Sequence, residues 1–253
     1  MNPQDIAHFA ETYLEPRLEA LTRLDARTRL DAFVRHDLPW ESAAPDAFVC
    51  PVEFVAIPIQ WIKCSFTLTA PPLRLGREDH VLVGFRFSAL YDPGAVDFDI
   101  GVNRGHGPLA RLAIFRHRWA VGPDAGETVA AELARAMDEQ WPAAFARFGT
   151  VEPYIAQIKR HAAADVGWLE TLAYSHALAG DVEAARQAVA RILRDPHRTP
   201  EINDRAALIG RLLASSPAAA IDRLTEWRRG RLEAEGLLPF AAKRKVAPVA
   251  ERT

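Results

Sequence analysis

Hydrophobic side chains occupy every second position in two neighbouring stretches near the middle of the chain, residues 80–87 and 96–102. The alternating residues are Val81, Val83, Phe85 and Phe87 in the first stretch and Val96, Phe98, Ile100 and Val102 in the second. Successive side chains of a β-strand point to opposite faces, so this period predicts two strands with one buried face each. Between them, the sequence YDPG places Pro93 and Gly94 at the central positions of a type II turn. The two strands are therefore predicted to form an antiparallel hairpin.

Further strand-like runs lie on both sides of this hairpin. Residues 47–69 contain one or two of them, and residues 109–121 contain another. Pro51 and Pro58 favour an edge position or a bulge for the earlier run, because proline cannot donate to the strand ladder. Together these runs predict an antiparallel meander of about four to five strands.

Towards both ends of the chain the spacing of hydrophobic residues changes to three and four, which is typical of helices. It predicts an N-terminal helical arm within residues 1–40. After the strands, an apolar stripe from Val129 to Phe148 predicts a helix that covers the sheet. We expect this helix to break at Pro142, because proline removes one hydrogen bond and clashes with the preceding turn.

The C-terminal half carries two pairs of a capping residue followed by proline, Thr199-Pro200 and Ser216-Pro217. Such pairs are typical of helix starts, and a glycine such as Gly236 is typical of a helix end. The pattern predicts helices near residues 200–214 and 217–235. The resulting domain prediction is a sheet with its covering helix at 41–148, a helical hairpin region at 149–238 and a disordered tail at 239–253.

The stretch GWLETLAYSHALAGDVEAARQAVARIL, residues 167–193, resembles one tetratricopeptide unit. Its small and apolar residues fill the inward positions of two helices, and Gly180 stands at the turn between them. Repeats of this kind bury their faces against neighbours, yet the sequence holds no second copy. We therefore expect a helical hairpin that packs against its flanking helices; a peptide-binding repeat array is the alternative.

The order of elements, with FRFSALYDPGAVDFDIGVN, then ELARAMDEQWPAAFARFG, then AYSHALAGDVEAARQAV, resembles that of some bacterial proteins known only as domains of unknown function. The resemblance covers residues 48–195. It supports the α+β fold that the patterns above predict, in which an antiparallel sheet is flanked by helices and followed by a helical, tetratricopeptide-like half. It implies no activity, because those proteins have none assigned.

Composition narrows the class of partner. The formal net charge of −2 offers no general attraction to nucleic acid, and no apolar run approaches the length of a membrane span. Cys50 and Cys64 lack the spacing of a redox or zinc motif. We therefore expect a cytoplasmic protein that binds neither nucleic acid nor membrane and requires no cofactor or metal.

Asp97 and Asp99 are weak candidates for catalytic residues, because alternate strand positions place both carboxylates on one face. Paired carboxylates could hold a hard cation or exchange protons. The favoured interpretation is a cross-strand charge ladder in which Arg86, and Arg116 or Arg118, oppose them.

The glycine-rich sequence GVNRGHG, residues 101–107, offers Arg104 and His106 as groups that could meet a phosphate. A strand-like run follows it, whereas anion-binding loops of this kind lead into a helix. A hairpin loop is therefore the favoured interpretation.

From these observations we expect a non-enzymatic interaction protein of the bacterial cytoplasm, such as an adaptor or an immunity-type protein, whose partner is another protein. The alternative is a hydrolase-like enzyme in which Asp97, Asp99, His106 and Arg116 converge on the open face of the sheet. Self-association as a homodimer through the C-terminal helices is a further expectation.

Overall fold

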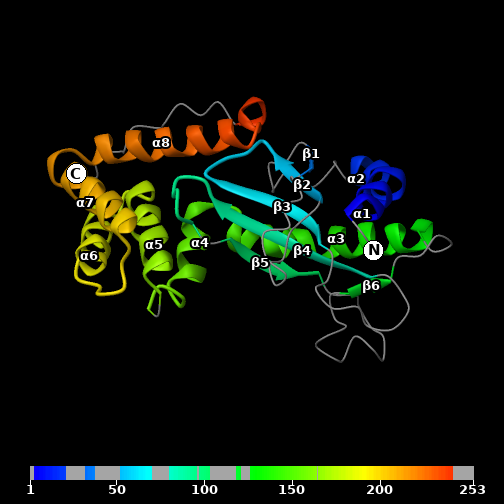
Figure 1. The fold of residues 1–253 in the computed structure, drawn as a ribbon, viewed down its shortest axis with the longest axis horizontal. Helices are drawn as coiled ribbons and strands as arrows, with labels where there is room; N and C mark the ends of the chain where they lie inside the picture. Colours follow the sequence, from blue (N-terminus) through cyan, green and yellow to red (C-terminus); the bar gives the residue numbers. More distant parts are fainter. Residues whose placement is uncertain are drawn as a thin grey trace. The chain divides into compact units, whose positions relative to one another are not determined.

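The computed structural model describes residues 3–20, 32–37, 52–69, 80–95, 97–102, 118–120, 126–163 and 165–241. Within these ranges, six strands form one sheet in the order β1-β2-β3-β4-β5, and β6 also pairs with β4 (Figure 1). Their bounds are β1 Ala32–Asp37, β2 Val52–Ile57, β3 Ile62–Thr69, β4 His80–Ala89, β5 Phe98–Gly101 and β6 Arg118–Ala120. Strands β1 to β5 are neighbours in the sheet in the order of the chain, so the predicted meander and the α+β class are confirmed.

The predicted hairpin is β4 and β5, whose antiparallel register pairs Arg86 with Asp99 and Phe87 with Phe98. Its turn does not have the predicted type II geometry. Gly94 lacks the positive φ which that geometry requires; among the described glycines, φ is positive at Gly180 and Gly236. The glycine serves a different purpose, because the side chains of Arg205 and Glu170 approach it closely.

One face of the sheet is covered by α3, Gly126–Phe148 (Figure 1). The ring of Trp141, which is fully buried, lies 5.1 Å from Phe85 and 6.2 Å from Phe87, measured between centroids. The predicted break at Pro142 is wrong, because the helix continues through it to Phe148. The aromatic contacts on either side of the proline hold the helix in place despite the missing hydrogen bond.

The N-terminal arm departs from the predicted helical pattern. Pro3–Phe9 and Glu15–Ala20 form α1 and α2, joined by a π-helical turn. Residues 32–37 form β1 instead of a helix, and they pair antiparallel with β2 from Ala32–Ile57 to Asp37–Val52. Strand pairing here overrides the local spacing of Phe33 and Val34, since such spacing is a weaker determinant than tertiary contact.

The C-terminal half is helical. Its elements are α4 Val151–Ile158, α5 Val166–Leu178, α6 Val182–Ile192, α7 Pro200–Ser215 and α8 Pro217–Ala234. Each of these helices packs on the next, and α5 also contacts α7 and α8 (Figure 1). The predicted caps are confirmed: the Thr199 and Ser216 side chains accept from the first-turn amides of α7 and α8, and Gly236 follows α8 with a φ of 69°.

The chain divides into two compact units. The sheet unit comprises residues 1–58, 64–87 and 98–145, and the helical unit comprises residues 59–63, 88–97 and 146–253. The helical unit extends beyond the predicted region 149–238 in one respect. The helical unit includes two short segments from the ends of strand hairpins, because their polar groups bond to helices.

The first of these segments is residues 59–63, between β2 and β3. Ile59 forms a parallel bridge with Ala241, and its amide donates to the carbonyl of Phe240 at 2.9 Å. The start of the predicted disordered tail, 239–253, is thus ordered as far as Ala241, since η3, Leu238–Phe240, and this bridge lie within it. The remaining tail residues lie outside the described ranges.

A search of the described helices for a membrane-spanning segment finds none with the necessary length and hydrophobicity.

Candidate functional site

The acidic residues predicted from the sequence lie on or next to β5, and both are exposed. Asp99 receives two hydrogen bonds from Arg86 on β4, at 2.8 and 2.9 Å, so this carboxylate has a bidentate partner. Asp97 accepts a hydrogen bond of 2.5 Å from Ser88. The Arg86 pair has the geometry of the cross-strand ladder.

His106 and Arg116, the other two candidates, lie outside the described residues, as does the loop GVNRGHG beyond Val102. Among the residues that are described, no group of three His, Cys, Asp or Glu side chains is placed to hold a metal ion. The hydrolase hypothesis therefore gains no support from the described part of the sheet.

The same strands carry a buried polar group that the sequence analysis missed. Glu53 on β2 is fully buried and accepts a hydrogen bond of 2.5 Å from Ser65 on β3. Thr67 donates to the carbonyl of Gly84 at 3.1 Å. These bonds satisfy polar groups inside the sheet unit, which is the structural requirement for burying them.

A larger buried polar network lies in the helical unit, where the turn between β4 and β5 meets α5. Asp92 is fully buried; its Oδ2 accepts from Thr171 at 2.6 Å, and its Oδ1 accepts from the Gly94 amide at 2.9 Å. Tyr91 is also fully buried, with its hydroxyl 2.6 Å from Ser175 Oγ. Side chains of the turn are therefore bound along one side of α5.

The charge next to this turn belongs to Glu170 on α5, whose side chain is fully buried. Arg205 on α7 donates to both of its oxygens at 2.8 Å, and the Tyr174 hydroxyl donates to Oε1 at 2.7 Å. Gly94 lies directly over this pair: a Cβ there would be 2.6 Å from Arg205 Nη2 and 3.3 Å from Glu170 Oε2. The turn can approach the ion pair only because residue 94 lacks a side chain.

Helix α8 binds backbone carbonyls of both hairpin ends. Arg231 donates to the carbonyls of Ala89 and Asp92 at 3.0 and 3.2 Å. Arg228 donates to the carbonyls of Gln60 and Ile59 at 2.5 and 2.9 Å, and its guanidinium lies 5.6 Å from the centre of the Trp61 ring. Burial lowers the pKa of Arg228. These arginines supply donors for carbonyl groups that sheet pairing leaves free at the hairpin ends.

Burial, and secondarily the negative charge of Glu170, raise the pKa of Asp92 to about 7. The pKa of Arg205 is raised, first because its side chain is hydrogen-bonded to Glu170. Burial, with the nearby charge of Glu170, raises the pKa of Tyr174 above its usual range, and burial does the same for Tyr91. The network therefore keeps its phenols neutral and its guanidinium charged.

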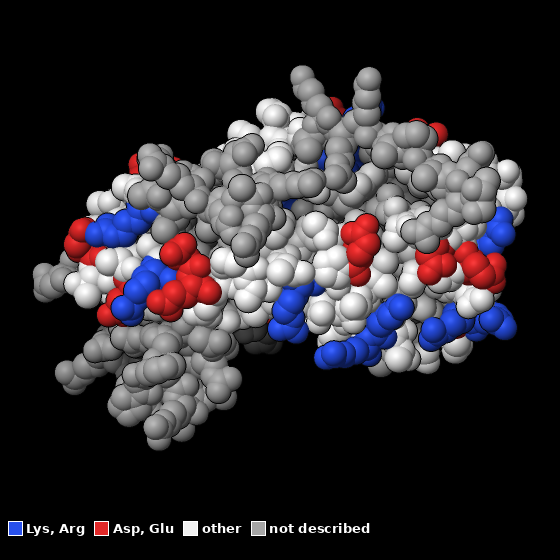
Figure 2. All heavy atoms as spheres, turned by 180° about the vertical axis from the view of Figure 1, so that it is seen from behind, with Lys and Arg blue, Asp and Glu red and all other residues white. Residues whose placement is uncertain are grey.

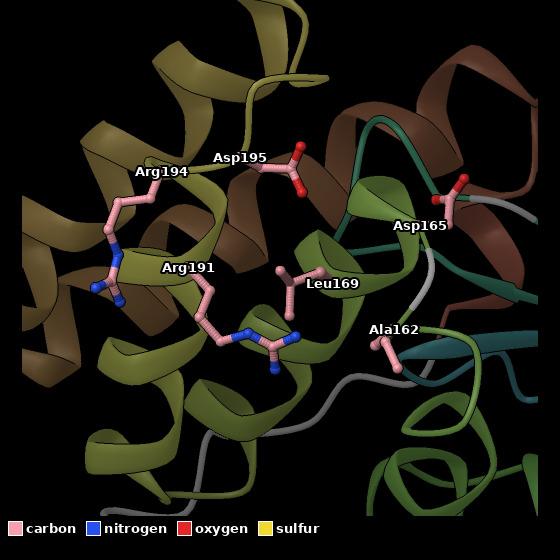
Figure 3. Close-up of a pocket in the computed structure, with 7 residues that line it drawn as sticks. Ala162, Asp165, Leu169, Arg191, Arg194 and Asp195 are labelled. Atoms are coloured by element: carbon pink, nitrogen blue, oxygen red, sulfur yellow. The ribbon is translucent and has the colours of Figure 1, made fainter.

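A pocket of about 250 Å³ lies in the same unit, at the N-terminal end of α5 and the C-terminal end of α6 (Figure 3). Its lining residues are Ala162, Ala163, Asp165, Leu169, Arg191, Arg194 and Asp195. Figure 3 shows Arg191 reaching towards Leu169, whereas Arg194 points away from it. The guanidinium that can serve the pocket is therefore that of Arg191.

The charged groups of the pocket differ in their bonding. Asp165 caps α5 by accepting from the amides of Gly167 and Trp168, and Asp195 accepts from the amide of His197. Arg191 is exposed, and its side chain forms no hydrogen bond or ion pair with any other residue in the described part of the chain. The pocket thus presents a mostly polar surface, with the Arg191 guanidinium on one side and two hydrogen-bonded carboxylates on the other.

Charges elsewhere on the visible surface are mixed. On the face drawn in Figure 2, the basic and acidic side chains of the described residues lie in small separate groups.

Comparison of the chain with protein-family models, with curated proteins and with solved structures finds no match.

One sign of the buried network is visible in the sequence. In the helical stretch 167–178, Glu170, Thr171 and Ser175 occupy positions where a helix packed on all sides would carry apolar residues. A charged residue on such a helix requires a buried partner. The identity of that partner, Arg205, could not be read from spacing, because it lies on another helix.

Proposed function

We propose that this chain is a non-enzymatic interaction protein that binds a segment of a partner protein in the pocket between α5 and α6. The observation that carries the proposal is Arg191, whose exposed guanidinium lines the pocket beside Leu169 and has no partner among the described residues. A carboxylate on the partner would form a charge-assisted hydrogen bond with it. The methylene groups of the partner's acidic side chain would rest on Leu169.

The opposite side of the pocket restricts which segment fits. Asp165 and Asp195 place negative charge near the bound segment, even though each accepts backbone hydrogen bonds. A run of several acidic residues would be repelled there, since like charges brought together at an interface are unfavourable. The expected ligand is therefore a protein segment with one carboxylate next to an apolar residue.

Rigidity of α5 supports this proposal. Nine consecutive residues of the helix, from Leu169 to Ala177, are buried, and the network around Glu170 fixes the helix against α7. A binding surface on a helix that is held in this way loses little conformational entropy when a partner docks. Leu169, which is 3% exposed, stands at the boundary between the pocket and this core.

The proposed setting is a reducing compartment such as the bacterial cytoplasm, where the protein acts as an adaptor or an immunity-type protein. A second copy of this chain is the alternative occupant of the pocket.

The test places a photo-crosslinking amino acid at Ala163, an exposed lining residue, in the native host. Cross-linked peptides are identified by mass spectrometry, synthesised, and compared with versions in which Glu or Asp is replaced by Gln or Asn. The proposal expects the acidic peptide to bind about tenfold more tightly than its neutral version. It expects Arg191→Glu to abolish that preference, because the substitution reverses the charge.

The matched control is Arg211→Glu on α7, an exposed arginine that does not line the pocket and changes the net charge equally. This variant should bind the peptide as the unmodified chain does. If both variants lost the preference for the acidic peptide equally, the overall charge of the chain would explain that preference, and the proposal would be overturned. Cross-links that join two copies of this chain would assign the pocket to homodimer formation, and light scattering would then detect the dimer.

A further inference from the structure

The turn at residues 89–95, named here the latch turn, is held through a carboxyl group that has two complete bonding arrangements. Thr171 Oγ1 lies 2.6 Å from Asp92 Oδ2 and 3.2 Å from the carbonyl oxygen of Gly167. With Asp92 ionised, the hydroxyl donates to Oδ2. With Asp92 protonated on Oδ2, the carboxyl donates to Oγ1 and the hydroxyl turns to donate to Gly167. The Gly94 amide donates to Oδ1 in both states.

The two states differ in charge, and the surroundings favour the neutral one. From α5, Glu170 brings a second buried carboxylate, and the Tyr174 hydroxyl already donates to it. From α7, Arg205 is the cation near this turn, and both of its described bonds go to Glu170. Ionising Asp92 would therefore place two buried carboxylates against one guanidinium.

The remaining groups around the turn do not neutralise that charge. From α8, Arg231 directs its bonds to the backbone carbonyls of Ala89 and Asp92 and lies 3.5 Å from Glu235. Within the turn itself, the Tyr91 phenol is neutral and lies against Ser175. A proton on Asp92 removes the repulsion while every hydrogen bond of the carboxyl group keeps a partner.

We propose that Asp92 is the proton-binding residue of a pH-sensitive latch that holds residues 89–95 against α5, α7 and α8. The latch is closed when Asp92 is protonated, and it loosens when the proton leaves. Protonation thereby regulates whether this side of α5 is covered by the chain's own turn.

The direction of the pH effect follows from the two pKa values of Asp92. The pKa is about 7 with the latch closed, and it falls towards the ordinary aspartate value near 4 when the turn is open to water. At a pH between these two pKa values, the closed latch binds one proton more than the open one. Closure therefore weakens as the pH rises from about 4 to about 7. Above about 7 both states are ionised, and closure no longer changes with pH.

Two measurements on the full chain test the latch. The first follows the side-chain carboxyl carbon of Asp92 by NMR during a pH titration and expects its midpoint near 7. The second follows amide hydrogen exchange of residues 88–95, corrected for intrinsic rates. As the pH rises towards 7, protection of these amides should fall by up to about tenfold per pH unit, and above pH 7 it should level off.

Variants separate protonation from general packing. Asp92→Asn imitates the protonated carboxyl, because its amide can donate to Thr171 while its oxygen accepts from Gly94. In this variant, the amide protection of residues 88–95 should be independent of pH. Asp222→Asn, at an exposed position on α8, removes a charge outside the network and should keep the wild-type profile. Thr171→Ser, which retains the hydroxyl, should also keep it.

The NMR titration of the unmodified chain decides the question even if a variant fails to fold. A midpoint for Asp92 at or below about 4, the ordinary range for an exposed carboxyl, would overturn the latch. Equal pH dependence of protection in the unmodified chain and in Asp92→Asn would also overturn it, because the titrating group would then lie elsewhere.

Discussion

Arg205 on α7 donates one hydrogen bond to each carboxylate oxygen of Glu170 on α5, both with a length of 2.8 Å, and the carboxylate is completely removed from solvent. This ion pair joins two helices that are not consecutive in the chain. It also lies directly beneath Gly94, so it is the point at which the turn and both helices meet.

Removing one member of this pair should destabilise the helical unit strongly. Arg205→Ala leaves a buried carboxylate without its cation, and the expected cost is about 3 to 5 kcal/mol of unfolding free energy. Chemical unfolding followed by far-UV circular dichroism measures it. Replacing both residues, Glu170→Leu together with Arg205→Leu, should cost less than Arg205→Ala, since no charge is then stranded. A larger cost for the double variant would contradict this account of the pair.

Gly94→Ala should be destabilising even though its backbone can accept alanine. The new Cβ would lie 2.6 Å from Arg205 Nη2, so either the guanidinium or the turn must move, at a cost of about 1 to 3 kcal/mol. The matched control is Gly230→Ala on α8, where a Cβ meets no atom within 4 Å. That variant should gain about 0.5 to 1 kcal/mol from helix propensity. Thermal unfolding of the two variants should shift in opposite directions.

Pro142→Ala should stabilise the sheet unit. Pro142 is exposed within α3 and cannot donate to the carbonyl one turn earlier. Restoring the amide should add about 1 to 3 kcal/mol, provided that the contacts of Trp141 are kept. Denaturant unfolding measures the change, and Ala143→Gly, also exposed in the same turn, should lower stability by about 1 kcal/mol. An unchanged midpoint for Pro142→Ala would mean that the helix has adapted fully to its proline.

Cys64 should resist alkylation in the folded protein. The side chain is 4% exposed, and burial raises the pKa of its thiol well above the usual range, so little reactive thiolate forms. Peptide mapping after iodoacetamide treatment should find this residue unmodified until denaturant is added. Modification of Cys64 at the rate of an unfolded control peptide would show that β3 opens readily.

The sequence predicted the parts of the fold that depend on local pattern. Alternation identified β4 and β5, and the pairs Thr199-Pro200 and Ser216-Pro217 marked the starts of α7 and α8. Each of these signals acts within one turn or one strand, so no distant residue is needed to read it.

Features that depend on distant partners could not be predicted. Residues 32–37 form a strand because β2 is beside them, and α3 passes through Pro142 because Trp141 is anchored on the sheet. The candidate sites follow the same rule. Spacing singled out Asp97 and Asp99 as chemically interesting, whereas the carboxyl groups with a buried network are Asp92 and Glu170, whose partners lie on separate helices.

The three-part composition of the helical unit affects the order in which the chain can fold during synthesis. Asp92 leaves the ribosome long before Arg231, which lies 139 residues later and donates a hydrogen bond to the carbonyl of Asp92. At roughly 5 to 20 residues per second, the interval is roughly 7 to 28 seconds. During that time β4 and β5 can already pair and the turn between them can meet α5, but the carbonyls of Ala89 and Asp92 still lack the guanidinium of Arg231. Helix α8 therefore completes a contact whose other member, Asp92, was synthesised 139 residues earlier.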